Sequence, residues 1–183
     1  MTRIVWGITG SGDLIHEIIA TMKKLEEDEK FRLTVIISKA GEQMLRLYRL
    51  WDELSLSFSK VLKESNANVP FIAGPLQIGK YDALIVAPLT ANSTAKIAHG
   101  IADTLITNAV AQTLKGNTPV LLYPVDQVDE EVHTIGPKGE KFAIKPRSID
   151  LENVRRLREM ERVTVLDSPL KIPQLLADLL KKE

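Results

Sequence analysis

Short runs of apolar, mostly β-branched residues alternate along the chain with longer segments of helical spacing, and this alternation limits the fold more than any other feature. The apolar runs cover residues 3–8, 33–37, 81–87 and 119–123. The segments that follow them repeat their apolar residues at helical intervals, over residues 13–27, 42–54, 91–99 and 104–115. Because apolar strands buried on both faces are typical of parallel sheets, we predict an α/β fold, a Rossmann-like parallel sheet with helices on both faces.

The sequence also predicts where several helices begin, end and face the core. In the helix over residues 13–27, the inward stripe is expected to hold Leu14, Ile15, Ile18, Ile19, Met22 and Leu25. Asp103 stands where an N-cap belongs. Gly100 and Gly116 stand where a helix ends in a left-handed residue.

The C-terminal third departs from this alternation. Residues 132–135 and 141–145 flank the sequence GPKG, which predicts a β-hairpin. A charged helix over residues 151–161, a strand over 163–165 and a helix over 172–182 are expected to follow. No linker or low-complexity segment separates these parts, so we expect residues 1–183 to form a single domain.

Composition excludes several classes of protein. The 183 residues include no cysteine, so the chain offers no thiolate for an iron–sulfur cluster or a zinc-thiolate centre, and we predict no metal site. The 24 basic residues balance 24 acidic ones, which argues against a general nucleic-acid binder. The longest apolar stretch, residues 83–89, is too short to span a membrane, and no signal peptide is recognised. We expect a cytoplasmic protein with no nucleic-acid or membrane partner.

The first candidate site is the sequence GITGSGD, residues 7–13, between the first strand and the first helix. Small residues at such a turn let an anion approach free backbone N–H groups. The spacing differs from the GxGxxG dinucleotide fingerprint and from a P-loop, and Ser38 stands where an acid would hold an NAD ribose. The loop therefore suits one phosphate, with Ser38 as a second hydroxyl donor. The alternative is a tight turn capped by Asp13.

The second candidate site is the sequence APLTANSTA, residues 87–95, at the end of another strand. Hydroxyl, amide and small side chains dominate this segment, and no charge occurs before Lys96. Such a loop can surround a neutral polar ligand but cannot run acid–base chemistry near neutral pH. The alternative is a helix N-terminus rich in capping residues.

Together these segments resemble a known family. The sequence APLTANSTAKIAHGIADTLIT at residues 87–107, with GITGS at residues 7–11 and Ser38, is similar to the FMN-binding flavoproteins related to the homo-oligomeric flavin-containing cysteine decarboxylases. The resemblance implies that Gly10, Ser11, Gly12 and Ser38 bind the FMN phosphate and that Thr90, Ala91, Asn92 and Ser93 line the ribityl chain and ring. With the neighbouring Thr9 and Pro88 these form the candidate cofactor-binding set. The resemblance also implies self-association as a trimer or a dodecamer, with FMN near the subunit interface.

Departures from the decarboxylase pattern indicate a particular branch. Members that decarboxylate carry a histidine where this chain has Gly74, and a Met-Asn clamp where it has PVDQVD at residues 124–129. The prenyl-transferring members place an Arg-Glu pair there, which Val125 and Asp126 do not match. Further segments, at residues 5–13, 47–51, 66–71 and 76–82, resemble the archaeoflavoproteins and the related dihydromethanopterin reductases. We therefore predict no catalytic side chain, since a flavin carries the chemistry of electron transfer itself.

The resemblance implies an FMN-dependent oxidoreductase that takes electrons from ferredoxin or a similar small donor and passes them to an unidentified acceptor. The alternatives are a dihydromethanopterin reductase, a cysteine-type decarboxylase without the usual histidine, and a flavin store without turnover. If the donor is an acidic ferredoxin, the basic cluster of Lys138, Lys141, Lys145 and Arg147 is its expected docking surface. Tyr48 and Trp51, three residues apart on one helix face, are expected to pack rather than to stack on a flavin.

Overall fold

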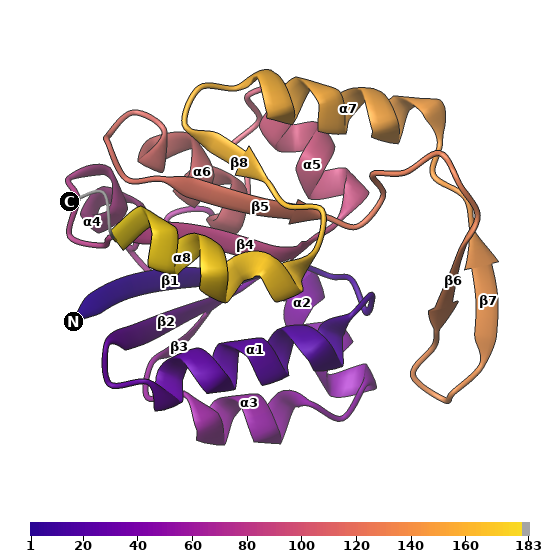
Figure 1. The fold of residues 1–183 in the computed structure, drawn as a ribbon, viewed down its shortest axis with the longest axis horizontal. Helices are drawn as coiled ribbons and strands as arrows, with labels where there is room; N and C mark the ends of the chain where they lie inside the picture. The colour runs from indigo at the N-terminus through magenta and orange to yellow at the C-terminus, as the bar shows by residue number, and fades with distance from the viewer. Residues whose placement is uncertain (181–183) are drawn as a thin grey trace.

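Six parallel strands form the central sheet, in the order β3-β2-β1-β4-β5-β8 (Figure 1). The computed structural model describes residues 1–180. The strands are β1 (Thr2–Ile8), β2 (Phe31–Ile37), β3 (Val61–Lys63), β4 (Ala83–Leu89), β5 (Val120–Pro124) and β8 (Val163–Val165). The strand order reverses between β1 and β4, as in doubly wound nucleotide-binding sheets. The predicted Rossmann-like fold is confirmed.

Helices cover both faces of this sheet and enclose two apolar cores. One face packs against α1 (Ile15–Glu27), α2 (Lys39–Leu47), α3 (Trp51–Ser57) and α8 (Ile172–Leu180), with a short 3₁₀ turn at Pro169–Lys171 before α8. The other face packs against α4 (Ala73–Gln77), α5 (Ala91–Ala98), α6 (Leu105–Thr113) and α7 (Ser148–Glu159). In β1, Trp6 faces the first core and Val5 the second, each without solvent exposure. Alternate residues of one strand therefore fill both cores, which is why the apolar runs are uninterrupted.

The helix predicted over residues 42–54 is two helices. Arg49 adopts a left-handed conformation with φ of 59°. The N–H of Leu50 donates to the carbonyl of Leu45 at 2.8 Å, and the N–H of Arg49 donates to the carbonyl of Arg46 at 3.0 Å. These two bonds form a Schellman motif, which ends α2 and leaves Tyr48 at its C-cap. The prediction was wrong because a left-handed arginine gives no glycine signal in the sequence.

Two expected features of the first helix are also wrong. Leu14 takes a left-handed conformation with φ of 49° just before α1 and is 37% exposed, so it does not belong to the inward stripe. The other five predicted members of that stripe are buried. Asp13 does not cap the helix, because no side chain accepts a hydrogen bond at that end.

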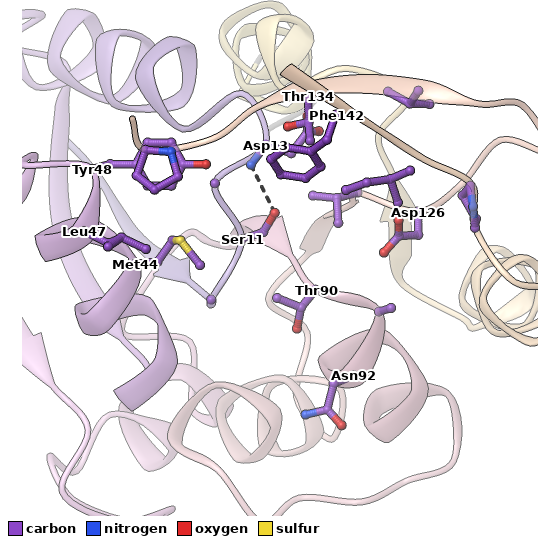
Figure 2. A pocket seen from close by; sticks show the side chains of 18 residues that line it. Ser11, Asp13, Met44, Leu47, Tyr48, Thr90, Asn92, Asp126, Thr134 and Phe142 are labelled. Carbon is purple, nitrogen blue, oxygen red and sulfur yellow. Dashed lines mark hydrogen bonds between the residues drawn. The ribbon is translucent and has the colours of Figure 1, made fainter. Parts of the chain in front are cut away.

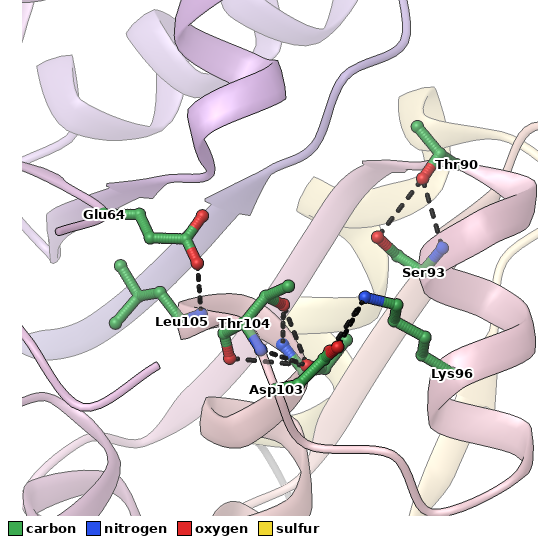
Figure 3. Close-up of polar contacts among 8 residues, drawn as sticks. Glu64, Thr90, Ser93, Lys96, Asp103, Thr104 and Leu105 are labelled. Carbon is green, nitrogen blue, oxygen red and sulfur yellow. Dashed lines mark hydrogen bonds and ion pairs between the residues drawn. The ribbon is translucent and has the colours of Figure 1, made fainter. Parts of the chain in front are cut away.

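The caps around α6 differ from expectation as well. Thr104, not Asp103, is its N-cap, since the hydroxyl of Thr104 accepts from the N–H of Thr107 at 3.2 Å. Asp103 instead pairs with Lys96 at 2.8 Å (Figure 3). Gly100 has a φ of 72°, as predicted for a residue that ends a helix, whereas Gly116 is not among the residues of positive φ.

The predicted hairpin is present and extends past the carboxyl edge of the sheet (Figure 1). Its strands, β6 (Val132–Ile135) and β7 (Lys141–Ile144), pair antiparallel, and Gly139 in the turn has a φ of 83°. Neither β3 nor α4 was expected, and α7 begins three residues before its predicted start and ends two before its predicted end. The last helix begins at Ile172 as predicted, but its expected end lies outside the described residues.

Candidate functional site

Thr9 joins the ends of β1 and β4, where the strand order reverses. Its hydroxyl donates to the carbonyl of Pro88 at 2.8 Å and accepts from the N–H of Thr90 at 2.9 Å. Its own N–H also donates to the Pro88 carbonyl, at 3.2 Å. The side chain is 1% exposed. Thr9 therefore sets the spacing between the two loops that the sequence singled out.

The loop after β1 presents its backbone at the edge of the sheet. Within residues 1–180, the N–H groups of Gly10 and Gly12 have no protein partner. The loop keeps its shape because the hydroxyl of Ser11 accepts from the N–H of Asp13 at 3.2 Å. A Cβ at Gly12 would overlap the phenol ring of Tyr48, and a Cβ at Gly10 would come 2.7 Å from that of Ala40. The loop thus needs glycine at both positions because Ala40 and Tyr48 pack against it, and it presents two free N–H donors of the kind that suit an anion.

The loop after β4 leads directly into α5. The hydroxyl of Thr90 caps this helix by accepting from the N–H of Ser93 at 3.2 Å (Figure 3). The N–H groups of Ala91 and Asn92 lie in the first turn, where no helical partner exists. Polar groups from the two loops therefore converge at the point where open α/β sheets bind ligands.

A cavity of about 460 Å³ opens between these loops, the end of α2 and the hairpin (Figure 2). Its polar side consists of Gly10, Ser11, Gly12, Asp13, Thr90, Ala91, Asn92 and Asp126. Its apolar side consists mainly of Met44, Leu47, Tyr48, Val125, Val132, Phe142, Ile144, Pro137 and Pro146, with Thr134 among them. This volume lies within the usual range for small-molecule sites.

The hairpin is held over the cavity by Tyr48. The hydroxyl of Tyr48 donates to the carbonyl of Ile135 on β6 at 2.9 Å. The cross-strand pairs Val132–Ile144 and Thr134–Phe142 line the cavity, so the alternate residue His133 belongs to the other face of the hairpin. Phe142 and Ile144 are 44% and 42% exposed, which leaves an apolar wall open to a flat ligand.

Both charged side chains that line the cavity are acidic. Burial raises the pKa of the Asp13 carboxyl, partly offset by the Tyr123 hydroxyl, which donates to it at 3.4 Å. Burial also raises the pKa of Asp126, with a further increase from the charge of Asp150 and a decrease from that of Arg147. Burial and the nearby Asp13 raise the pKa of Tyr123 far above its ordinary value, so its hydroxyl stays protonated.

Six of the ten candidate residues line the cavity: Gly10, Ser11, Gly12, Thr90, Ala91 and Asn92. The other four, Thr9, Ser38, Pro88 and Ser93, are not among the residues that line it. Ser38 is 8% exposed, and its hydroxyl caps α2 by accepting from the N–H of Gly41 at 2.9 Å. The sequence interpretation missed the contribution of Met44, Leu47, Asp126 and the inward face of the hairpin.

Tyr48 and Trp51 both pack against the first core, as expected, and Arg46 lies over the ring of Trp51. Tyr48 also lines the cavity, which the packing role alone did not predict. Half of the basic cluster is paired within the chain, because Lys145 contacts Asp129 at 3.4 Å and Arg147 contacts Asp150 at 2.7 Å.

No histidine contributes to the cavity in the part of the chain that the structure describes. His99 contacts the side-chain oxygen of Asn153 at 3.1 Å, and His16 lies edge-on to the ring of Tyr48 with centroids 6.2 Å apart. Residues 71–76, where a decarboxylase histidine would stand, do not line the cavity either. Over residues 1–180 there is no cluster of three acidic or histidine side chains that could hold a metal ion, and no helix long and apolar enough to cross a membrane.

The doubly wound sheet and the cavity at its switch point define a Rossmann-like α/β protein with a candidate ligand site between β1 and β4. The chain belongs to the Flavoprotein family, which matches residues 1–181. The resemblance drawn from residues 87–107 is thereby confirmed.

Several relatives are similar over nearly the whole chain. An uncharacterized protein of Methanocaldococcus jannaschii is 47% identical over 176 residues, which cover 96% of this chain and 95% of that protein. A protein of the same organism named dihydromethanopterin reductase (acceptor) is 32% identical over 230 positions, which cover 93% of this chain and 94% of that one. The crystal structure of Burkholderia xenovorans DmrB in complex with FMN, described as a cubic protein cage for redox transfer, has a TM-score of 0.84 and 34% identity. The match covers 99% of this chain and 96% of the DmrB chain.

Proposed function

We propose that this protein is an FMN-dependent oxidoreductase that takes electrons from ferredoxin or a similar small donor and passes them to an acceptor. The observation that carries the proposal is the cavity at the β1–β4 switch point, with free N–H donors on one side and an apolar wall on the other. A phosphate suits the first side and a flat aromatic ring suits the second. FMN combines both groups in one molecule.

The chain's own residues would bind and orient the cofactor. The N–H groups of Gly10 and Gly12 and the hydroxyl of Ser11 would hold the phosphate. Ser38 keeps a hydroxyl proton to donate while its oxygen accepts from Gly41. Polar groups at Thr90, Ala91 and Asn92 suit the ribityl chain. Bound FMN supplies electron transfer, and the protein contributes position, access and electrostatics.

The apolar wall would fix the ring and limit water around it. Met44, Tyr48 and Phe142 reach the cavity from α2 and the hairpin (Figure 2). Tyr48 also ties the hairpin to the body of the protein, so ring contact and closure depend on the same side chain. An electron-transfer role needs no histidine here, and no imidazole lines the cavity in the described part of the chain.

A dihydromethanopterin reductase is the second candidate, and it is favoured by the relatives that carry this name. The similarity to DmrB extends over nearly the full length of both chains. The M. jannaschii reductase, however, aligns over 230 positions with a 183-residue chain, so it has segments without a counterpart here. We therefore propose no particular acceptor for this chain.

Self-association is part of the proposal. The outward face of the hairpin carries exposed apolar surface, with Ile135 59% exposed. A two-stranded hairpin is marginally stable alone in water, so cover from a second copy would stabilise it. DmrB is described as a cubic cage and an Escherichia coli relative of the same fold as dodecameric, which supports a symmetric assembly.

The test is anaerobic reduction of the FMN-loaded protein by reduced ferredoxin and by reduced nicotinamide, followed by flavin absorbance. The proposal expects stoichiometric FMN and faster bleaching with ferredoxin. Addition of dihydromethanopterin to the reduced protein then separates the two candidates, since only the reductase would be reoxidised by it. Protein that binds no FMN would refute both.

A further inference from the structure

The charged side chains that line the cavity give it an excess of negative charge. Asp13 and Asp126 are its two charged lining residues, and no Lys, Arg or His joins them within the described part of the chain. Electrons delivered to a cofactor in this cavity would add further negative charge beside two carboxylates. Such charge is poorly screened in a partly buried site, so proton uptake must accompany the electrons.

Asp13 is held in place and faces no cation. Its backbone N–H donates to the Ser11 hydroxyl at 3.2 Å, and its carboxylate accepts from the Tyr123 hydroxyl at 3.4 Å. The ionisable groups that act on it are Glu17 on α1, Tyr123 on β5, Asp126 after β5 and Tyr48 at the end of α2. The lining residues of the hairpin and of the loop before α5 are uncharged.

Asp126 differs from Asp13 in one respect. The guanidinium of Arg147 lowers the pKa of Asp126 and so partly compensates for burial and for the charge of Asp150. Asp13 has no such partner, and burial together with Asp126 and Glu17 raises its pKa against the effect of Tyr123. Asp13 therefore meets added negative charge with no cation beside it, and it follows Gly10 and Gly12 in the same loop, whose free N–H groups would attract an anionic ligand, so we choose it rather than Asp126.

Building on the FMN-dependent function above, we propose that Asp13 is the redox-linked proton site of this protein, taking up one proton from solvent when the cavity receives an electron pair. Two one-electron donors of the iron–sulfur class are oxidised and the flavin is reduced. One proton from water binds the flavin, and a second forms an O–H bond on the Asp13 carboxylate. In total the cavity gains two electrons and two protons, so its net charge does not change.

The proposal has a measurable consequence at equilibrium. For each proton taken up with the electrons, the equilibrium constant for reduction of the FMN-loaded protein falls by about tenfold per pH unit. Between the pKa of Asp13 in the oxidised protein and its higher pKa in the reduced one, the wild type takes up one proton more than an Asp13→Asn variant. At the acid end of this interval the two proteins converge, because Asp13 is then protonated in both redox states.

The test is a pH series of equilibrium reductions of the FMN-loaded protein against a reference dye. For each pH unit within this interval, we expect the equilibrium constant for reduction to fall by an additional factor of about ten in the wild type compared with Asp13→Asn. The matched control Asp126→Asn, which removes the same charge from the same cavity, keeps the steep slope. Tyr123→Phe moves the steep interval to higher pH, because the carboxylate loses a donor. Equal slopes in the wild type and Asp13→Asn would overturn the proposal.

A second readout uses the unmodified protein. The carboxyl carbon of Asp13, observed by NMR with ¹³C-labelled aspartate, should titrate at a higher pH in the reduced protein than in the oxidised one. An unchanged titration overturns the proposal even if Asp13→Asn fails to fold or to retain FMN. Failure of the wild type to bind FMN would instead refute the function on which the proposal rests, so the two failures are distinguishable.

Discussion

Replacement of Thr9 by valine tests the idea that one buried hydroxyl spaces the two loops of the site. The change preserves shape but removes the bond to the Pro88 carbonyl at 2.8 Å and the acceptor of the Thr90 N–H at 2.9 Å. The Pro88 carbonyl keeps the N–H of residue 9, whereas the Thr90 N–H loses its partner. An unsatisfied buried donor costs about 1–3 kcal/mol, so we expect the free energy of unfolding to fall by about 2 kcal/mol.

The assay is urea unfolding of the apoprotein together with FMN titration by fluorescence. Thr113→Val is the matched control, because Thr113 is fully buried and its hydroxyl donates to the carbonyl of Ala109 at 2.6 Å. That carbonyl also accepts a backbone hydrogen bond within α6, so it keeps a partner when the hydroxyl is removed. We expect Thr9→Val to lose more stability than the control. We also expect it to bind FMN at least about tenfold more weakly than the wild type, which corresponds to about 1.4 kcal/mol of binding free energy. Equal losses in both properties for the two variants would refute the spacing role.

Three further predictions concern single contacts. Gly12→Ala places a Cβ against the Tyr48 phenol and should weaken FMN binding by more than about tenfold in a fluorescence titration, whereas Tyr48→Phe, which keeps the ring, should weaken it less. Glu64 accepts the N–H group of Lys39 at the start of α2 and that of Leu105 at the start of α6, each at 2.9 Å, and Figure 3 shows the contact with Leu105. Glu64→Ala should therefore cost about 1–2 kcal/mol in urea unfolding, and Glu29→Ala, on an exposed turn, much less. Hydrogen bonds from Arg147 lower the pKa of Asp150, so its stabilisation is present above about pH 4 and is lost below that. The difference in stability between the wild type and Asp150→Asn should therefore shrink on acidification, and a constant difference would contradict this.

The central sheet could be predicted because its strands are buried on both faces. Residues 83–89 illustrate this, since every one of them is buried and the apolar run extends through the strand. The two loops of the site could be found for a similar reason, because a strand end followed by small and hydroxyl residues is a local pattern. The hairpin was equally local, given two glycines between β-branched runs.

The rest of the site depends on contacts between distant residues. Tyr48 reaches the cavity because a left-handed Arg49 ends α2 and because its hydroxyl bonds to Ile135, which lies 87 residues further along the chain. Asp126 enters the cavity by following β5, and nothing in its own segment distinguishes it from Asp129. Leu14 leaves the inward stripe of α1 because it takes a left-handed conformation where the loop joins the helix, and the sequence carries no glycine to signal it.

The central claim is tested most directly by the flavin absorbance of the FMN-loaded protein after anaerobic mixing with reduced ferredoxin. We predict one FMN per chain and bleaching that is faster with reduced ferredoxin than with NADH supplying the same number of electrons. A protein that holds no FMN, or whose bound FMN is not reduced by ferredoxin, would contradict it.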